Sequence, residues 1–183
     1  MSKTILTLLV LLVAPFVDAT TLVPAELGEL SHDAVAIARG RVVATDARWT
    51  DDRRSIETLV TLDVERYLKG DLGSTVQFLV PGGQLGRFQR VFVGAPAFAA
   101  DDRVVVFLGA SGPTIPHLVG FSQGVYRLVL DRASGWMVTP PAMWPSGAGA
   151  GAGTQKIVRG DASRVPMALA DFESRVRALA GTR

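Results

Sequence analysis

The segment Gly120–Gly124 reads Gly-Phe-Ser-Gln-Gly and matches the G-x-S-x-G pattern that presents a nucleophilic serine in many hydrolases. In such an enzyme Ser122 would attack a carbonyl carbon, and a histidine later in the chain would take its proton. Both histidines, His32 and His117, precede Ser122. The pattern also needs a helix after the serine, whereas the residues from Val125 onward indicate a strand. We therefore favour a strand bend bracketed by glycines and keep a serine hydrolase that uses Ser122 as an alternative.

Carboxylate pairs, histidines and a glycine-rich run are the other groups that could support chemistry. Asp51-Asp52 and Asp101-Asp102 would bind calcium or act as an acid and a base if the pairs met in space. Each pair lies at an expected turn, precedes an arginine and lacks the spacing of a calcium loop, which indicates solvated turn residues. Two isolated histidines without cysteine predict no metal site. The Gly-Ala run over residues 147–153 fits no phosphate-loop spacing, so we expect a connector there and no cofactor.

The best candidate for a binding site is the segment Gly82–Phe98, which carries polar, cationic and aromatic side chains between glycines. Loops on a rigid β framework commonly carry function. The side chains expected to bind a ligand or partner are Gln84, Arg87, Phe88 and Arg90. The competing interpretation is that Phe88, Val91 and Val93 close one end of the sheet and that the arginines are merely exposed.

A second apolar cluster follows later in the chain. We expect it to cover the core rather than to bind a ligand. Its members are Trp136, Met137, Met143 and Trp144.

Composition narrows the class of protein. The chain has 183 residues, of which 48% are hydrophobic and 20% charged, so it is too apolar for a disordered protein. Nineteen Lys and Arg against 17 Asp and Glu leave a net charge of +2, which is too small to indicate a nucleic-acid partner. The chain has no cysteine, so disulfides and thiol nucleophiles are excluded.

The N-terminal residues 1–19 have the pattern of a secretory signal peptide. Lys3 provides the basic start, Ile5–Val17 the apolar stretch and Val17-Asp18-Ala19 a cleavage site, which would make Thr20 the mature N-terminus. About 13 apolar residues are fewer than the roughly 20 needed to span a bilayer. We therefore expect an exported protein, periplasmic or secreted, that meets the membrane only through an uncleaved signal segment.

Hydrophobic periodicity predicts a mainly β protein. A short helix is expected over Leu22–Leu30, and an amphipathic helix with Phe172, Val176 and Leu179 on one face is expected near the C-terminus. No helical stretch between residues 34 and 139 is long enough for a parallel crossover, which favours an antiparallel sheet curled into a small barrel. The expected strands are Ala34–Trp49, Ile56–Lys69, Thr75–Val80, Arg103–Leu108, Leu118–Phe121, Val125–Leu130 and Trp136–Val138.

These elements divide the mature chain into three parts. We expect the β-barrel domain over residues 20–144, a Gly/Ala-rich linker over residues 145–160 and the C-terminal helix, packed on the barrel, over residues 161–183. A helix that binds a partner instead of the barrel is the alternative for the last part.

Several segments in this order resemble uncharacterised exported proteins of bacteria, over about residues 22–130. The segments that carry the likeness are Ala34–Val42, Val64–Gly70, Val80–Gly83, Gly94–Phe98, Asp102–Leu108 and Gln123–Tyr126. More distantly, a short helix, a barrel and the sequence from Val64 to Leu108 resemble the OB barrels of netrin modules and tissue inhibitors of metalloproteinases. Animal inhibitors of that type use an N-terminal cysteine, which this chain lacks, so no site residue is transferred from either resemblance.

The leading functional hypothesis is a non-catalytic, exported binding or interaction module of unknown ligand. A protease inhibitor directed at metalloproteases is the second hypothesis, and the Ser122 hydrolase is the third. We expect the partner to be a protein or small ligand in the cell envelope or outside the cell.

Overall fold

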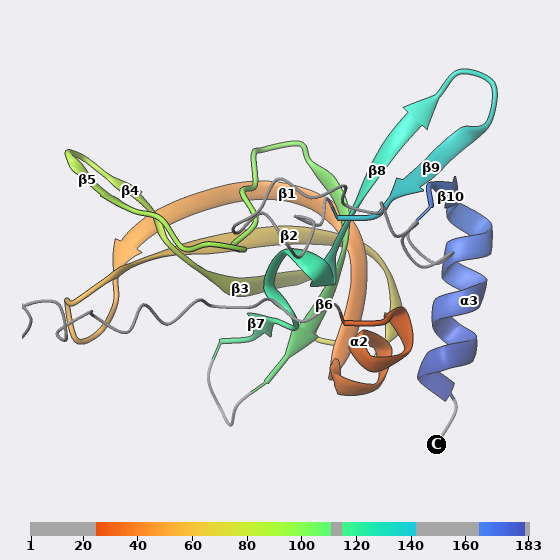
Figure 1. The fold of residues 1–183 in the computed structure, drawn as a ribbon, viewed down its shortest axis with the longest axis horizontal. Helices are drawn as coiled ribbons and strands as arrows, with labels where there is room; N and C mark the ends of the chain where they lie inside the picture. Colours follow the sequence, from red (N-terminus) through yellow and green to blue (C-terminus); the bar gives the residue numbers. More distant parts are fainter. Residues whose placement is uncertain (1–24, 111–114, 142–164, 182–183) are drawn as a thin grey trace, which may run out of the picture.

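The computed structural model describes residues 25–110, 115–141 and 165–181 (Figure 1). The expected signal peptide, Thr20 and the expected Gly/Ala-rich linker lie outside these residues, as do Met143 and Trp144. Within the described ranges, no helix combines the length and apolar character needed to cross a membrane.

The described chain is mainly β, with a short helix at each end, as the sequence predicts. The helices are α2 (Leu27–Asp33) and α3 (Leu169–Gly181), and η1 (Phe121–Gly124) is one turn of 3-10 helix. The long or central strands are β1 (Ala36–Trp49), β2 (Ile56–Lys69), β3 (Thr75–Pro81), β6 (Arg103–Gly109) and β8 (Val125–Asp131). The shorter strands are β4 (Gly83–Leu85), β5 (Phe88–Arg90), β7 (His117–Leu118), β9 (Gly135–Thr139) and β10 (Met167–Ala168).

Eight strands form one mixed sheet in the order β1-β2-β3-β7-β6-β8-β9-β10, and β1 also pairs with β6. The pairings therefore run in a circuit of five strands, from β1 through β2, β3, β7 and β6 back to β1. The expectation of a purely antiparallel sheet is wrong, because β3 and β7 pair in parallel at Leu79 and His117. A circuit with an odd number of strands cannot alternate in direction throughout, so at least one pairing must be parallel.

Strand β6 separates two apolar cores. Because successive side chains of a strand point to opposite faces, Val104 and Val106 enter one core while Val105 and Phe107 enter the other. The first core is lined mainly by the strands of the circuit and contains Phe78 and other fully buried residues. This arrangement confirms the prediction that the continuous apolar run from Arg103 to Leu108 is a strand buried on both faces.

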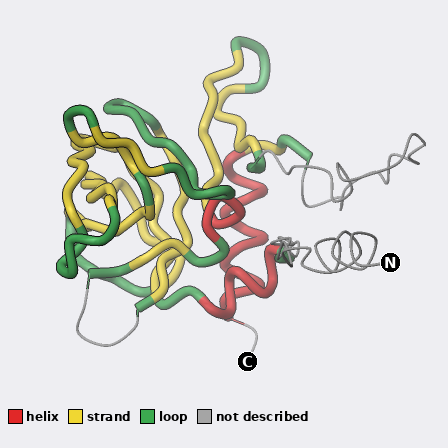
Figure 2. The backbone as a smooth tube through the Cα atoms, turned by 60° about the vertical axis from the view of Figure 1, so that its left-hand side comes forward, coloured by secondary structure: helices red, strands yellow, loops and turns green. Residues whose placement is uncertain are grey.

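The second core lies between the sheet and the two helices (Figure 2). Leu30 of α2 and Phe172 and Val176 of α3 pack there with Ile37 and Phe107 of the sheet. The predicted apolar stripe of the C-terminal helix is thus turned towards the strands, where its burial stabilises the docked helix. Figure 1 shows both helices at one end of the molecule and the β4–β5 hairpin at the other.

The β8–β9 hairpin confirms the expected turn but not the expected burial of Trp136. Asp131 accepts hydrogen bonds from the backbone N–H groups of Ala133 and Ser134, which confirms the predicted turn over Asp131–Gly135. Trp136, however, is exposed and lies 5.2 Å beneath the guanidinium of Arg103, so it does not cover the core as expected.

Candidate functional site

Two glycines, Gly82 and Gly83, lie at the start of the β4–β5 hairpin and pack closely against strand β2. The backbone N–H of Gly82 donates to the carbonyl of Ile56 at 2.9 Å, and the Thr58 hydroxyl donates to the carbonyl of Gly82 at 2.7 Å. Gly83 has a φ of 143°, and a Cβ placed there would meet the Thr58 oxygen at 2.5 Å. Only glycine therefore allows the hairpin backbone to approach β2 this closely.

The hairpin, the end of β1 and the chain just after β5 carry a group of exposed side chains that we call the hairpin surface. The rings of Trp49 and Phe88 meet edge to face with centroids 5.5 Å apart. The guanidinium of Arg87 lies 5.1 Å from the centre of the Phe88 ring, and that of Arg90 lies 5.6 Å from the Phe92 ring. The hairpin surface consists of Trp49, Arg87, Phe88, Arg90, Val91, Phe92 and Val93.

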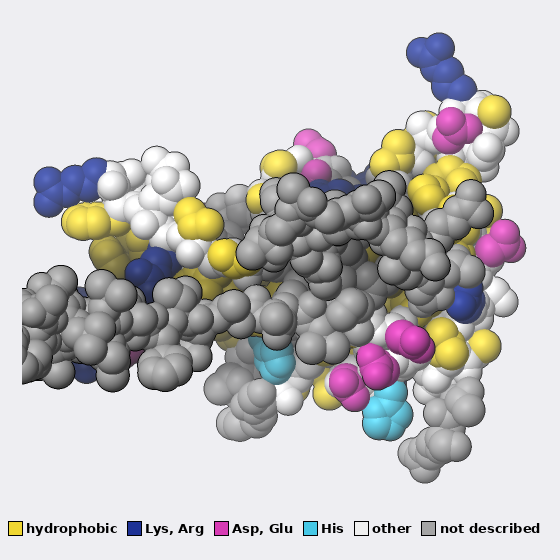
Figure 3. Space-filling model, in the orientation of Figure 1, with side chains coloured by type: hydrophobic (Ala, Val, Ile, Leu, Met, Phe, Trp, Pro, Cys, Tyr) yellow, Lys and Arg dark blue, Asp and Glu magenta, His cyan; other side chains and the backbone are white. Residues whose placement is uncertain are grey.

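These apolar side chains are not part of either core. Phe88 is 47% exposed, Val91 75% and Val93 96%. The part of the competing interpretation in which these three residues close one end of the framework is therefore wrong. Its other part agrees with the structure, because Arg87 and Arg90 are exposed. Figure 3 shows cationic and hydrophobic side chains together over the hairpin.

The charges of the hairpin surface are of one sign. From Leu72 to Ala100 the sequence contains no carboxylate, and Arg87 and Arg90 are its two charged residues. Among the described residues, neither arginine forms an ion pair. Each instead lies over an aromatic ring, which holds its guanidinium at the surface with hydrogen-bond donors available.

A cavity of about 420 Å³ lies between this hairpin, the strands β1 and β2, and the chain that follows β5. Gln84 and Arg90 line it, whereas Arg87 and Phe88 lie outside it. The structure thus divides the four predicted binding residues between a cavity and an exposed surface. Phe98, at the end of the predicted segment, is also in the wall. The sequence did not indicate Thr45 and Thr58, because only the pairing of distant strands brings them to the cavity.

The segment around Ser122 forms a bend, as favoured from the sequence. Gly120 has a φ of 66°, a turn of 3-10 helix contains the serine, and strand β8 follows at once. The Ser122 backbone N–H donates to the carbonyl of Gly94, and within the described residues its hydroxyl has no hydrogen bond to a histidine. A Cβ at Gly124 would lie 2.1 Å from the Val119 carbonyl oxygen, so tight packing explains this glycine.

The carboxylate pairs have separate structural roles. Hydrogen bonds from the Thr50 hydroxyl and from the Arg54 backbone lower the pKa of Asp52, which organises the turn between β1 and β2. Asp102 accepts from Arg127 at 2.7 Å and from the Ala99 backbone, and Asp101 accepts from Arg41. Over the described ranges, no three His, Asp or Glu side chains lie close enough together to hold a metal ion.

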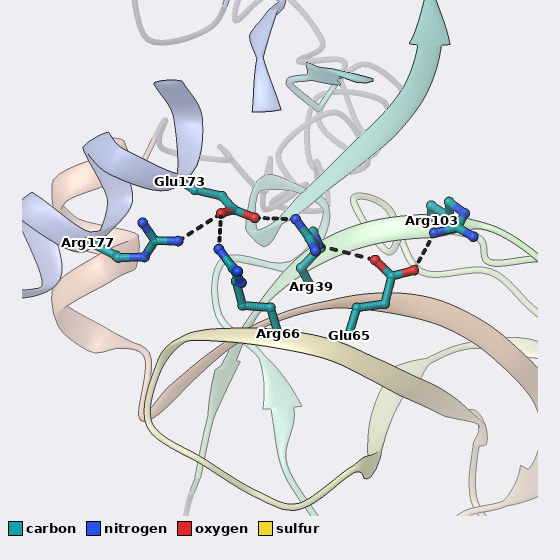
Figure 4. Close-up of polar contacts among 6 residues, drawn as sticks. All are labelled: Arg39, Glu65, Arg66, Arg103, Glu173 and Arg177. Carbon is teal, nitrogen blue, oxygen red and sulfur yellow. Dashed lines mark hydrogen bonds and ion pairs between the residues drawn. The ribbon is translucent and has the colours of Figure 1, made fainter. Parts of the chain in front are cut away.

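An ionic network centred on the buried Glu173, which the sequence did not indicate, connects α3 to the sheet (Figure 4). Glu173 is 5% exposed and accepts hydrogen bonds from Arg39, from Arg66 at 3.2 Å and from Arg177 at 2.8 Å. Glu65 forms ion pairs with Arg39, at 3.3 Å, and with Arg103. Four guanidinium groups share two carboxylates, and every group in the network has an opposite charge beside it.

The sequence offers one weak signal for this network, the i,i+4 pair of Glu173 and Arg177 on α3. The other two contacts of Glu173 join residues 107 and 134 positions apart, which no local pattern indicates. Because Glu173 is buried at the centre of the network and every charge has an opposite charge beside it, the network supports helix docking rather than binding of a ligand. Comparison of the chain with protein-family models, curated proteins and solved structures finds no match to any of them.

Proposed function

We propose that this protein is an exported, non-catalytic binding module that captures a protein partner through the hairpin surface. One observation carries the proposal: exposed aromatic and aliphatic side chains are grouped with two unpaired arginines on a hairpin anchored to the main sheet. Exposed apolar groups of this kind mark interaction sites, and Trp, Phe and Arg are enriched in interfaces. The partner is expected to present an apolar surface that carries acidic groups.

The framework for this module is proposed to be a small OB-like barrel. Its support is the circuit of pairings through β1, β2, β3, β7 and β6, with one parallel pairing between β3 and β7. A five-stranded barrel with a binding surface at its loops is typical of that fold. Export is proposed from the sequence of residues 1–19.

The test is capture of partners from envelope and secreted fractions by mature protein that begins at Thr20. Phe88→Ala and Arg87→Ala should reduce capture by about 10-fold or more, as expected for residues at the centre of an interface. Leu130→Ala and Arg132→Ala are matched controls, because both residues are exposed on the other hairpin, and they should leave capture unchanged. Equal capture by all four variants would refute the assignment of the binding site.

A protease inhibitor is the second candidate, and the proposed OB-like circuit favours it through the resemblance to metalloproteinase inhibitors. That mechanism would depend on the amino group of Thr20, which lies outside the described residues. Inhibition of a metalloprotease that disappears when this amine is acetylated would support the inhibitor over the hairpin surface.

A further inference from the structure

The cavity beside the hairpin surface has walls of different chemistry. Strands β1 and β2 contribute Thr45 and Thr58, the hairpin contributes Gln84 and Gln89, and the chain after β5 contributes Phe92 and Phe98. A volume of about 420 Å³ is within the range of ligand sites and holds one or two side chains of a bound segment. The cavity therefore offers both apolar and hydrogen-bonding contacts to one ligand.

Arg90 decides which charge the cavity accepts. It is the one charged side chain among the described residues that line the cavity, and it has no ion pair with any of them. Its contact with the Phe92 ring restricts the guanidinium, so less entropy is lost when a ligand binds. A guanidinium presents paired donors that match the two oxygens of a carboxylate. The cavity thus favours a carboxylate and disfavours a cationic group.

The remaining polar groups suit a peptide backbone. The Thr58 hydroxyl already donates to Gly82, and the Gln84 amide nitrogen makes a long hydrogen bond of 3.4 Å to the Gly86 carbonyl. The Gln84 amide keeps its oxygen and its second N–H, and the Gln89 amide also lies on the cavity wall. The β4–β5 pair forms a sheet of its own, to which the described part of the chain adds no third strand, and Gln84 lies opposite Gln89 in its register. The two-residue connection makes that pair a non-hydrogen-bonded one, so the Gln89 backbone N–H and C=O point to the open edge. An open edge of this kind accepts an extended peptide.

Building on the proposed function, we propose that the cavity binds an extended segment of the partner in which a glutamate or aspartate is next to an apolar residue. The carboxylate pairs with Arg90, and the apolar side chain packs against Phe92 and Phe98. Arg90 and Phe92 belong to both the cavity and the hairpin surface. A partner that covers the exposed rings can therefore also place one of its segments in the cavity. A free carboxylic acid would fill the cavity without contacting those rings.

The test is selection of random hexapeptides, displayed on phage, against the mature protein. Selected peptides should be enriched in an acidic residue beside an apolar one, and each peptide resynthesised with Gln or Asn in place of the acid should bind about 10-fold more weakly. Arg90→Gln should weaken the acidic peptides by a similar factor. Arg132→Gln, which changes an exposed arginine on the other hairpin, should leave their affinity unchanged.

Four results would overturn the inference. Selected peptides without acidic residues, or equal binding to Arg90→Gln, would remove the role of the carboxylate. Complete displacement by N-acetylglutamate at the same affinity as the peptide would show that a small acid suffices. If the library yields no binder while partner capture still depends on Phe88, the peptide inference fails and the proposed function stands. If capture is also independent of Phe88 and Arg87, both fail.

Discussion

At the helix end, Phe172 is 1% exposed, and its neighbour Glu173 is surrounded by three arginines. At the hairpin end, Phe88 is half exposed, and Arg87 and Arg90 lie over aromatic rings without ion pairs to described residues. The two ends use the same residue types, phenylalanine and arginine. They differ in whether the chain itself provides the partner of each group.

This difference separates groups that stabilise the fold from groups available for binding. A buried ring gains free energy by leaving water during folding, and a buried carboxylate must be paired to avoid a large desolvation cost. Exposed rings and unpaired guanidinium groups contribute less to stability, but they can still lose their contact with water when a partner binds. The helix end is therefore expected to respond to mutation in stability, and the hairpin end in binding.

The largest difference is expected between two phenylalanines. Phe172→Ala removes a ring that contacts Tyr126 in the second core, with centroids 4.8 Å apart, and should lower the free energy of unfolding by about 4 kcal/mol. Phe88→Ala removes the edge contact to Trp49 and should cost about 1 kcal/mol. Urea unfolding followed by circular dichroism measures both values. Equal losses would contradict the distinction between the two ends.

A smaller effect is expected for the charge at the helix end. Glu173→Ala leaves Arg39 partly buried beside Glu65 alone, and should reduce stability by about 3 kcal/mol. Glu65→Ala is the control, because Glu65 is more exposed and its removal should cost about 1 kcal/mol. Guanidinium unfolding of both variants tests the order. A more stable Glu173→Ala protein would show that desolvation of the network outweighs its ion pairs.

A still smaller loss of stability is expected where the hairpin is anchored. Gly83→Ala places a Cβ against the Thr58 hydroxyl at a positive φ and should cost about 2 kcal/mol. It should also displace the hairpin and so change the fluorescence of Trp49. Gly86→Asn is the control: Gly86 has a φ of 59° and open space around it, and asparagine tolerates that conformation. If both variants behave alike, close packing at Gly83 does not orient the hairpin.

The smallest effect on stability is expected for two carboxylates in turns, Asp131 between β8 and β9 and Asp52 between β1 and β2. Both should respond to pH in the same way. Backbone hydrogen bonds from Ser134 and Ala133 lower the pKa of Asp131, and hydrogen bonds from Thr50 and Arg54 lower the pKa of Asp52. Because each pKa lies below its unfolded value of about 3.9, the stabilisation is present above that pH and is lost as the pH falls through the folded-state pKa.

Asp131→Asn and Asp52→Asn should therefore each slightly reduce stability at pH 7. As the pH is lowered below 4, the stability of each variant should fall less steeply than that of the original protein. Unfolding measured as a function of pH tests this. A variant whose stability falls in acid as steeply as that of the original protein would show that the carboxylate does not contribute through these hydrogen bonds.

Some features of the fold follow from patterns within a few residues. Alternation from Ile56 to Lys69 predicted β2 with both of its bounds, and the apolar run after Arg103 predicted a strand buried on both faces. The glycines around Ser122, together with the strand that follows, predicted a bend. Local signals succeed here because a strand, turn or bend depends mainly on side-chain direction and backbone preferences of adjacent residues.

The candidate site was predicted only in part. Composition and glycine spacing indicated the segment that contains Gln84, Arg87, Phe88 and Arg90, but not that its apolar residues are exposed. Trp49 precedes Phe88 by 39 positions, so its contribution to the same surface depends on how β1 and the hairpin are placed in space. The cavity depends on the same placement.

The sequence by itself determined the longer strands, the turn at Asp131 and the apolar stripe that docks α3, because each is encoded in residues a few positions apart. It did not predict the short strands β4, β5 and β10, and the strand expected over Leu118–Phe121 is wrong beyond Leu118, because a 3-10 turn begins at Phe121. Only the tertiary structure decided the parallel pairing at Leu79 and His117, since an odd circuit of strands is a property of the whole sheet. It also brought Glu173 to Arg39 and Arg66, and left Arg87 and Arg90 unpaired among the described residues. Charge pairing depends on distance in space, and no local sequence pattern indicates which residues far apart in the chain lie close together.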